Sequence, residues 1–259
     1  MPSTMRKVLK ILRLVDQTLA TNSSNPRANF FIALALSALV FRYSLSLSVV
    51  NPAWFYYLIG ARVVYCTNVF SELLVCLVCT ELRVRLETLN GKIRTLQDHC
   101  KGEIKKLSDA FYAITKIQKD LAYSVRFFLL FDLSQLFMLI LSGFLNTCLR
   151  CSNFSNGKMT MNWCVYTLGM AMDGTWRFSA IAASCGRLQS EAEKTAELVN
   201  RHVIHSQNYK RKQELRIFFE VASFRKASFS ACGLFNVDLQ FLFATAGAIT
   251  GYIFLITQL

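Results

Sequence analysis

Long apolar segments alternate with charged segments along this chain. A helix needs roughly 20 mostly apolar residues to cross about 30 Å of hydrocarbon. Five segments are long and apolar enough to form such helices: residues 29–50, 54–80, 123–149, 161–185 and 232–259. The pattern therefore predicts an all-α, polytopic membrane protein, with two spans in 29–80, two in 123–185 and one in 232–259.

The charged connections between the spans also have a helical period. In residues 81–122, apolar side chains recur three or four positions apart, with charges between them. They are Leu82, Leu86, Leu89, Ile93, Leu96, Ile104, Leu107, Phe111, Ile114, Ile117 and Leu121. Residues 187–224, within the predicted anchor segment 186–231, follow the same pattern, with a polar interruption around 205–212. Because apolar stripes need packing partners, we expect long amphipathic helices that continue the spans and form a packed cytosolic anchor.

The distribution of basic residues predicts the orientation of the spans. The net charge is +13, and Lys plus Arg number 5 in residues 1–28, 10 in 81–126 and 9 in 186–226. The connections on the other side carry Arg150 and Lys158. Because cytosolic connections of membrane proteins are enriched in Lys and Arg, we predict a multi-pass protein of the cell membrane. Its N-terminal segment is cytosolic and its C-terminus is extracellular.

The predicted orientation indicates which connection can be glycosylated and which partners the basic residues contact. Asn153 begins the sequence Asn-Phe-Ser in an outer connection, which makes it a candidate for glycosylation. The excess of basic residues is expected to face membrane lipid headgroups. No nucleic-acid partner is expected, because no free soluble domain presents a basic face.

Motifs that would indicate catalysis are missing from the sequence. It has no P-loop, no GxGxxG, no nucleophile elbow and no HExxH. We therefore expect that the protein is not an enzyme and has no catalytic residues and no cofactor. We also expect no metal site, because His202 and His205 share a predicted helix but have no adjacent carboxylate pair. A transporter has little support, because no duplicated, Gly/Pro-broken helices are present.

The cysteines favour packing over a disulfide scaffold. Cys76 and Cys79 form a CxxC inside an apolar helix, where helix packing is the better interpretation. A disulfide is permitted on the outer side, among Cys148, Cys151 and Cys164.

Ionisable residues inside the spans are candidate functional residues, since each costs several kcal/mol unless it is paired or hydrated. They are Arg42, Arg62, Glu72, Asp132, Asp173 and Arg177. Asp173 and Arg177 are four residues apart and can pair within one helix. The alternative is that these groups line a water-filled pocket or vestibule.

The last span combines small residues in its middle with two polar residues near its end. Small residues are typical of tightly packed membrane helices. Tyr252 and Gln258 then occur in an otherwise apolar run. Gln258 is either an interfacial residue at the end of the span or part of a ring of amides in a symmetric pore.

The end of the chain resembles the insect gustatory receptor family, within the insect chemoreceptor superfamily. The family signature is Thr-Tyr, five hydrophobic residues and Gln-Phe at the end of the last helix. Here Tyr252 and Gln258 match with the correct spacing, whereas Gly251 and Leu259 replace the Thr and the Phe. Looser matches are found in residues 85–90, 191–195 and 229–238.

The resemblance implies a gustatory receptor subunit that is a ligand-gated, nonselective cation channel. It implies a homo- or hetero-tetramer with other gustatory receptors, activated by a small-molecule tastant. Bitter compounds are slightly favoured, because the chain lacks obvious closeness to the sugar or carbon dioxide groups. The last family helix would have two pieces, here 215–224 and 236–258, with Gln258 facing the conduction path and Leu255 forming the gate. The alternative is a non-conducting, divergent or truncated chemoreceptor-fold subunit with a structural or regulatory role.

The number of spans differs from that of the family. Five spans match the third to seventh of the family's seven, so the first two family helices are expected to be lacking here. A truncated gene model and a naturally short member are both open explanations.

Overall fold

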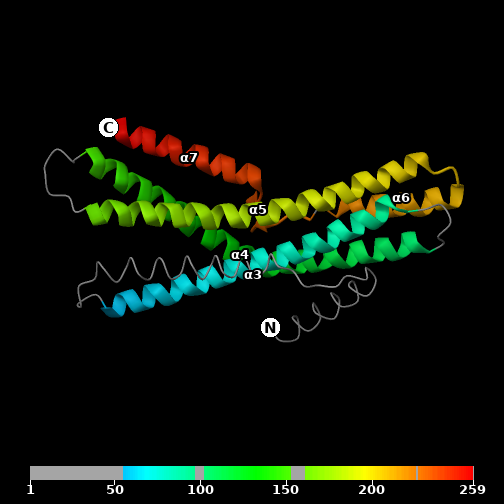
Figure 1. Ribbon diagram of the computed structural model, residues 1–259, viewed down its shortest axis with the longest axis horizontal. Coiled ribbons are helices and arrows are strands. Elements are labelled where there is room, and N and C mark those ends of the chain that lie inside the picture. The colour runs from blue at the N-terminus through cyan, green and yellow to red at the C-terminus, as the bar shows by residue number, and fades with distance from the viewer. Residues whose placement is uncertain (1–54, 97–101, 153–160, 226, 259) are drawn as a thin grey trace. The chain divides into compact units, whose positions relative to one another are not determined.

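The described part of the chain is almost entirely helical. The computed structural model describes residues 55–96, 102–152, 161–225 and 227–258. They form the elements of Figure 1 in this order: α3 (Phe55–Arg94), α4 (Glu103–Ser152), α5 (Met161–His205), α6 (Tyr209–Phe224), β1 (Ser230–Ala231), β2 (Phe235–Asn236) and α7 (Leu239–Gln258). The predicted segments 1–28 and 29–50, together with Arg42, Asn153 and the side chain of Arg62, lie outside the described residues.

Three helices are far longer than a membrane is thick. α3 has 40 residues, α4 has 50 and α5 has 45, so at 1.5 Å per residue they extend for about 60, 75 and 68 Å. Each is at least about twice the 30 Å of hydrocarbon. The predicted continuity of the apolar segments with the amphipathic segments that follow or precede them is therefore confirmed.

Two of the described helices pass a strict test of length and apolar composition for crossing a membrane. They are the stretch Glu103–Cys148 of α4 and the stretch Leu239–Ile256 of α7. The spans predicted in 54–80 and 161–185 lie within the continuous helices α3 and α5. Their membrane crossing stays a prediction.

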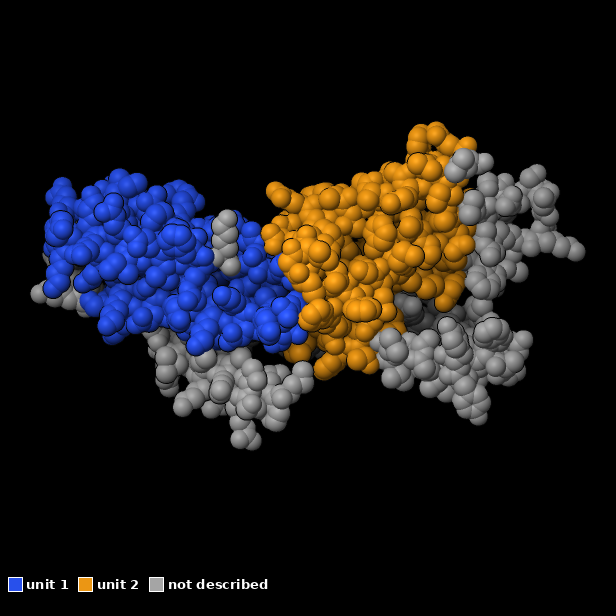
Figure 2. All heavy atoms as spheres, turned by 180° about the vertical axis from the view of Figure 1, so that it is seen from behind, with its two compact units in different colours: residues 1–24, 78–126, 184–230 blue, residues 25–77, 127–183, 231–259 orange. Residues whose placement is uncertain are grey.

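The described residues divide into two compact units, coloured separately in Figure 2. Unit 1 contains residues 78–126 and 184–230, and its core follows the predicted stripe. Nine of the eleven predicted apolar residues are buried, and Leu96 and Leu121 are half-buried. The Phe111 and Phe218 rings meet edge to face, with centroids 6.0 Å apart, so α6 supplies a packing partner for α4.

A buried polar bridge joins α3 to α5 inside unit 1. The Asn90 amide donates to the Glu191 backbone carbonyl at 3.1 Å and accepts from the Thr195 hydroxyl at 2.7 Å. Because an unpaired amide would be costly here, the bridge fixes the register of these two helices.

The described residues of unit 2 are 55–77, 127–152, 161–183 and 231–258. Within its described part, α4 and α5 approach closely at two glycines. A Cβ on Gly143 would lie 2.9 Å from the Thr167 carbonyl oxygen, and one on Gly174 would lie 2.9 Å from Ile140 Cγ1. Small residues at such crossings are typical of packed membrane helices.

A tight hairpin precedes α7. β1 and β2 form a two-stranded sheet, and the turn between them contains Cys232 (φ 54°) and Gly233 (φ 81°). The Leu234 amide donates to the Ala231 carbonyl oxygen at 3.0 Å. Two consecutive left-handed residues are the pattern of the two-residue hairpin turn.

The hairpin corrects the predicted start of the last span. The sequence analysis placed that span from residue 232, whereas α7 begins at Leu239. Left-handed backbone at Cys232 and Gly233 cannot continue a right-handed helix. Asp238 then starts α7, because its carboxylate accepts from the Phe241 amide at 2.8 Å.

Candidate functional site

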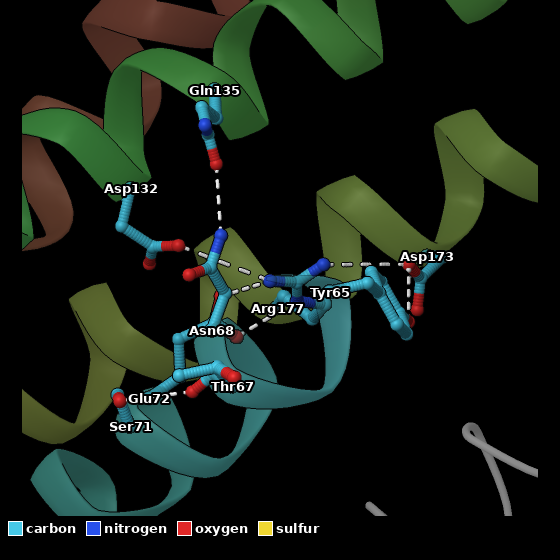
Figure 3. A network of polar contacts seen from close by, with 9 residues as sticks. All are labelled: Tyr65, Thr67, Asn68, Ser71, Glu72, Asp132, Gln135, Asp173 and Arg177. Carbon is cyan, nitrogen blue, oxygen red and sulfur yellow. Dashed lines mark hydrogen bonds and ion pairs between the residues drawn. The ribbon is translucent and has the colours of Figure 1, made fainter. Parts of the chain in front are cut away.

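Seven polar residues from three helices gather inside unit 2, and we call them the polar cluster (Figure 3). α3 contributes three, α4 contributes two and α5 contributes two, each set spaced three or four residues apart so that its members share a helix face. The members are Tyr65, Asn68, Glu72, Asp132, Gln135, Asp173 and Arg177. All lie in segments that the sequence predicts to span the membrane.

Arg177 is the centre of the polar cluster. Its Nε donates to Glu72 Oε2 at 2.8 Å, and its Nη2 donates to Glu72 Oε1. The side chains of Arg177 and Glu72 are 9% and 6% exposed. A two-pronged guanidinium–carboxylate pair of this kind joins α3 to α5 with fixed geometry.

The predicted pairing of Asp173 with Arg177 is confirmed, although it is the weaker contact. Asp173 Oδ2 lies 3.7 Å from Arg177 Nη1 and accepts from the Tyr65 hydroxyl at 2.9 Å. The Tyr65 ring also lies under the guanidinium, 4.9 Å from its carbon to the ring centroid. Asp173 therefore holds Tyr65 and Arg177 together at the edge of the cluster.

Asp132 differs from the other two carboxylates of the cluster. It is 2% exposed, and its Oδ1 lies 3.9 Å from Arg177 Nη2, beyond hydrogen-bonding distance. Neither of its oxygens accepts a hydrogen bond from any residue that the structure describes.

Three members of the cluster, Tyr65, Asn68 and Gln135, were not predicted from the sequence. The Asn68 side-chain amide donates to Gln135 Oε1 at 2.9 Å, which links α3 to α4. A search for ionisable residues passes over neutral amides. Polar residues three or four positions from Glu72 and Asp132 would have been the signal.

The second candidate region is the exposed side of α7. Its Thr245 and Ile249 are buried in unit 2, whereas Tyr252 and Leu255 are 55% and 59% exposed and Gln258 is exposed. The three residues of the predicted pore and gate therefore lie on the part of α7 that its own subunit leaves open.

The cysteines and histidines add no site to the described residues. Cys148 is a free thiol, so a disulfide of the outer cysteines would not include it; the side chains of Cys151 and Cys164 lie outside the described residues. Cys76 and Cys79 are buried in α3 and are not part of a disulfide, in line with the packing interpretation.

Comparison with known proteins identifies the family. A family model described as a 7tm chemosensory receptor matches residues 2–259. The chain belongs to this chemosensory receptor family. Membership makes it a membrane protein, and it confirms the resemblance to insect chemoreceptors that the C-terminal motif predicted.

Solved structures show the fold of this chemosensory receptor. It is similar to the insect olfactory receptor OR5 from Machilis hrabei, with a TM-score of 0.69 and 11% identity, over 96% of this chain and 69% of OR5. OR5 in complex with eugenol is similar with a TM-score of 0.59 and 12% identity, over 98% and 69% of the two chains. A sequence comparison with curated proteins gave no match.

Proposed function

We propose that this chemosensory receptor is a gustatory receptor subunit, a ligand-gated, nonselective cation channel that opens when a small-molecule tastant binds. Four copies, or copies together with other gustatory receptors, would surround the conduction path. Bitter compounds are the favoured ligand class. The eugenol complex of OR5 supports a small organic ligand.

The observation that carries the proposal is the combination of motif and exposure on α7. Tyr252 and Gln258 have the spacing of the gustatory signature, and both side chains are exposed on a mostly apolar helix. A hydroxyl and an amide facing hydrocarbon would lack hydrogen-bond partners, which costs free energy. A water-filled path shared by several subunits removes that cost.

Leu255 is the proposed gate. It lies three residues before Gln258, so the two share a side of the helix, and it is among the large apolar residues that the subunit leaves exposed. A ring of leucines narrow enough to exclude water blocks ions by dewetting. Movement of α7 that withdraws Leu255 from the axis would then open the path past Gln258.

Recording from cells that express the receptor tests the proposal. Leu255→Ala is expected to raise the basal leak current, because a smaller apolar ring no longer excludes water. Gln258→Glu is expected to shift the relative permeability to cations, because it changes the charge beside the path. Both effects are read from whole-cell currents with and without bitter compounds.

The matched control is Ile253→Ala. Ile253 is half-buried and lies about 160° around the helix from Leu255 and about 140° from Gln258. Its replacement is expected to leave the basal leak unchanged. If the currents of both Leu255→Ala and Gln258→Glu equal those of the unaltered receptor, the channel assignment is contradicted and a non-conducting subunit is favoured.

A further inference from the structure

The polar cluster holds more acidic groups than basic ones. Among its described side chains, three carboxyl groups surround one guanidinium, from Glu72, Asp132, Asp173 and Arg177. Uncompensated charge in a membrane-spanning segment costs several kcal/mol. Among these four described side chains, a carboxyl group that is not paired with the guanidinium is therefore favoured in its neutral, protonated form.

The hydrogen bonds identify which carboxyl group this is. Glu72 has both of its oxygens held by Arg177, and Asp173 accepts from Tyr65 and faces Arg177. Asp132 alone among the three has two oxygens that accept no hydrogen bond from the described residues. A buried acceptor without a donor is unfavourable.

The neighbour that Asp132 faces is itself an acceptor. Oδ1 of Asp132 and Oε1 of Glu72 both approach the same nitrogen, Nη2 of Arg177, so the two carboxyl groups lie side by side. Two ionised carboxylates repel each other and cannot hydrogen-bond. One proton between them turns the repulsion into an O–H···O bond.

We propose that Asp132 and Glu72 share one proton, so that the cluster is a proton-binding site joining α3 to α4. The Asp132 carboxylate takes the proton from water and donates it in a hydrogen bond to a Glu72 oxygen; Glu72 keeps its ion pair with Arg177. Loss of the proton leaves two adjacent like charges and weakens the contact between the helices. The inference does not depend on the channel proposal.

A proton fits the site better than a metal ion. No group of three or more His, Cys, Asp or Glu suited to hold a metal is found among the residues that the structure describes. Asp132 faces Arg177 from α5 and the Glu72 carboxyl from α3, which approaches the same nitrogen, whereas Tyr65 and Asp173 lie on the other side of Arg177 (Figure 3). A proton needs only the two carboxyl oxygens already in place.

Infrared spectroscopy of the full chain in lipid nanodiscs tests the proposal. Spectra recorded while the pH is raised are expected to lose the C=O stretch of a protonated carboxylic acid. Carbon-13 labelling of Asp side chains is expected to shift that band in the unaltered protein, whereas labelling of Glu side chains is not. A band that shifts only with the Glu label, or the absence of any such band, overturns the proposal.

Variants assign the band to a residue. Asp132→Asn is expected to abolish it and to flatten the pH dependence of the melting temperature, because the amide supplies the hydrogen that the proton supplied. Asp173→Asn is the matched control and is expected to keep the band, because Asp173 already has the Tyr65 donor. A band that persists in Asp132→Asn contradicts the proposal. A band that is absent in alkali salt and appears only when the alkali cations are replaced by N-methylglucamine also contradicts the proposal. That result would mean that an alkali cation, and not a proton, occupies the site in ordinary salt.

Discussion

At the scale of the residue, Arg177 links the helices of unit 2. Its guanidinium is paired with Glu72 on α3, lies beside Asp173 on its own helix and approaches Asp132 on α4. Removing one partner of a buried ion pair leaves an uncompensated charge behind. Loss of the Arg177 side chain would therefore destabilise unit 2, because it would leave buried carboxylates without their counter-charge.

Replacing Arg177 tests that role. Arg177→Met keeps the length of the side chain but leaves Glu72 without its donor, so the free energy of unfolding is expected to fall by about 3–5 kcal/mol. Arg187→Met, at an exposed arginine of the same helix, is expected to change it by at most about 0.5 kcal/mol. Denaturant unfolding in detergent measures both, and equal small losses would contradict the account.

The sequence predicted part of this site. The pairing of Asp173 with Arg177 follows from a spacing of four residues on one helix. Glu72 lies 105 residues before Arg177, and no local rule indicates which distant carboxylate a buried arginine will meet. Tertiary packing decides that choice, which is why the stronger partner was not predicted.

At the scale of the element, the start of α7 depends on a hairpin turn with unusual backbone angles. Gly233 has φ 81°, and Cys232 has φ 54° although it carries a side chain. Left-handed backbone costs a non-glycine residue about 1–2 kcal/mol. The turn and the Asp238 cap together set where the last helix begins.

Gly233→Ala measures the requirement for the turn. An added Cβ meets no atom within 4 Å at Gly233 or at Gly91, so crowding does not affect either change. Gly233→Ala is expected to lower the free energy of unfolding by about 1–2 kcal/mol, whereas Gly91→Ala, inside α3, is expected to raise it by about 0.5–1 kcal/mol. Thermal unfolding in detergent reads both, and the same sign for the two variants would rule out the backbone explanation.

Helix boundaries were predictable where the signal is local. The polar interruption around 205–212 corresponds to the break between α5 and α6, where the Asn208 side chain caps α6. The predicted end of the first piece of the last family helix, at residue 224, is also the end of α6. The hairpin was missed because the apolar sequence around Phe235 resembles the start of a span, and the left-handed turn is not visible in hydropathy.

At the scale of the whole molecule, two kinds of core occur along the same long helices. The core of unit 1 is an apolar stripe with charged residues on the opposite side, as amphipathic periodicity predicted. Unit 2 contains the polar cluster and the close glycine contacts of α4 with α5. Periodicity gives the first kind of core directly, whereas the second depends on which faces of apolar helices meet.

The measurement that tests the central claim most directly is cysteine accessibility on α7 during recording. In Leu255→Cys, a charged thiol reagent is expected to block the ligand-evoked current irreversibly, because the proposed gate lies in the conduction path. Ile253→Cys, about 160° around the helix from Leu255, and the unaltered receptor are expected to keep their currents. A ligand-evoked current in Leu255→Cys that survives the reagent, or is reduced no more than in Ile253→Cys, would contradict a pore lined by α7.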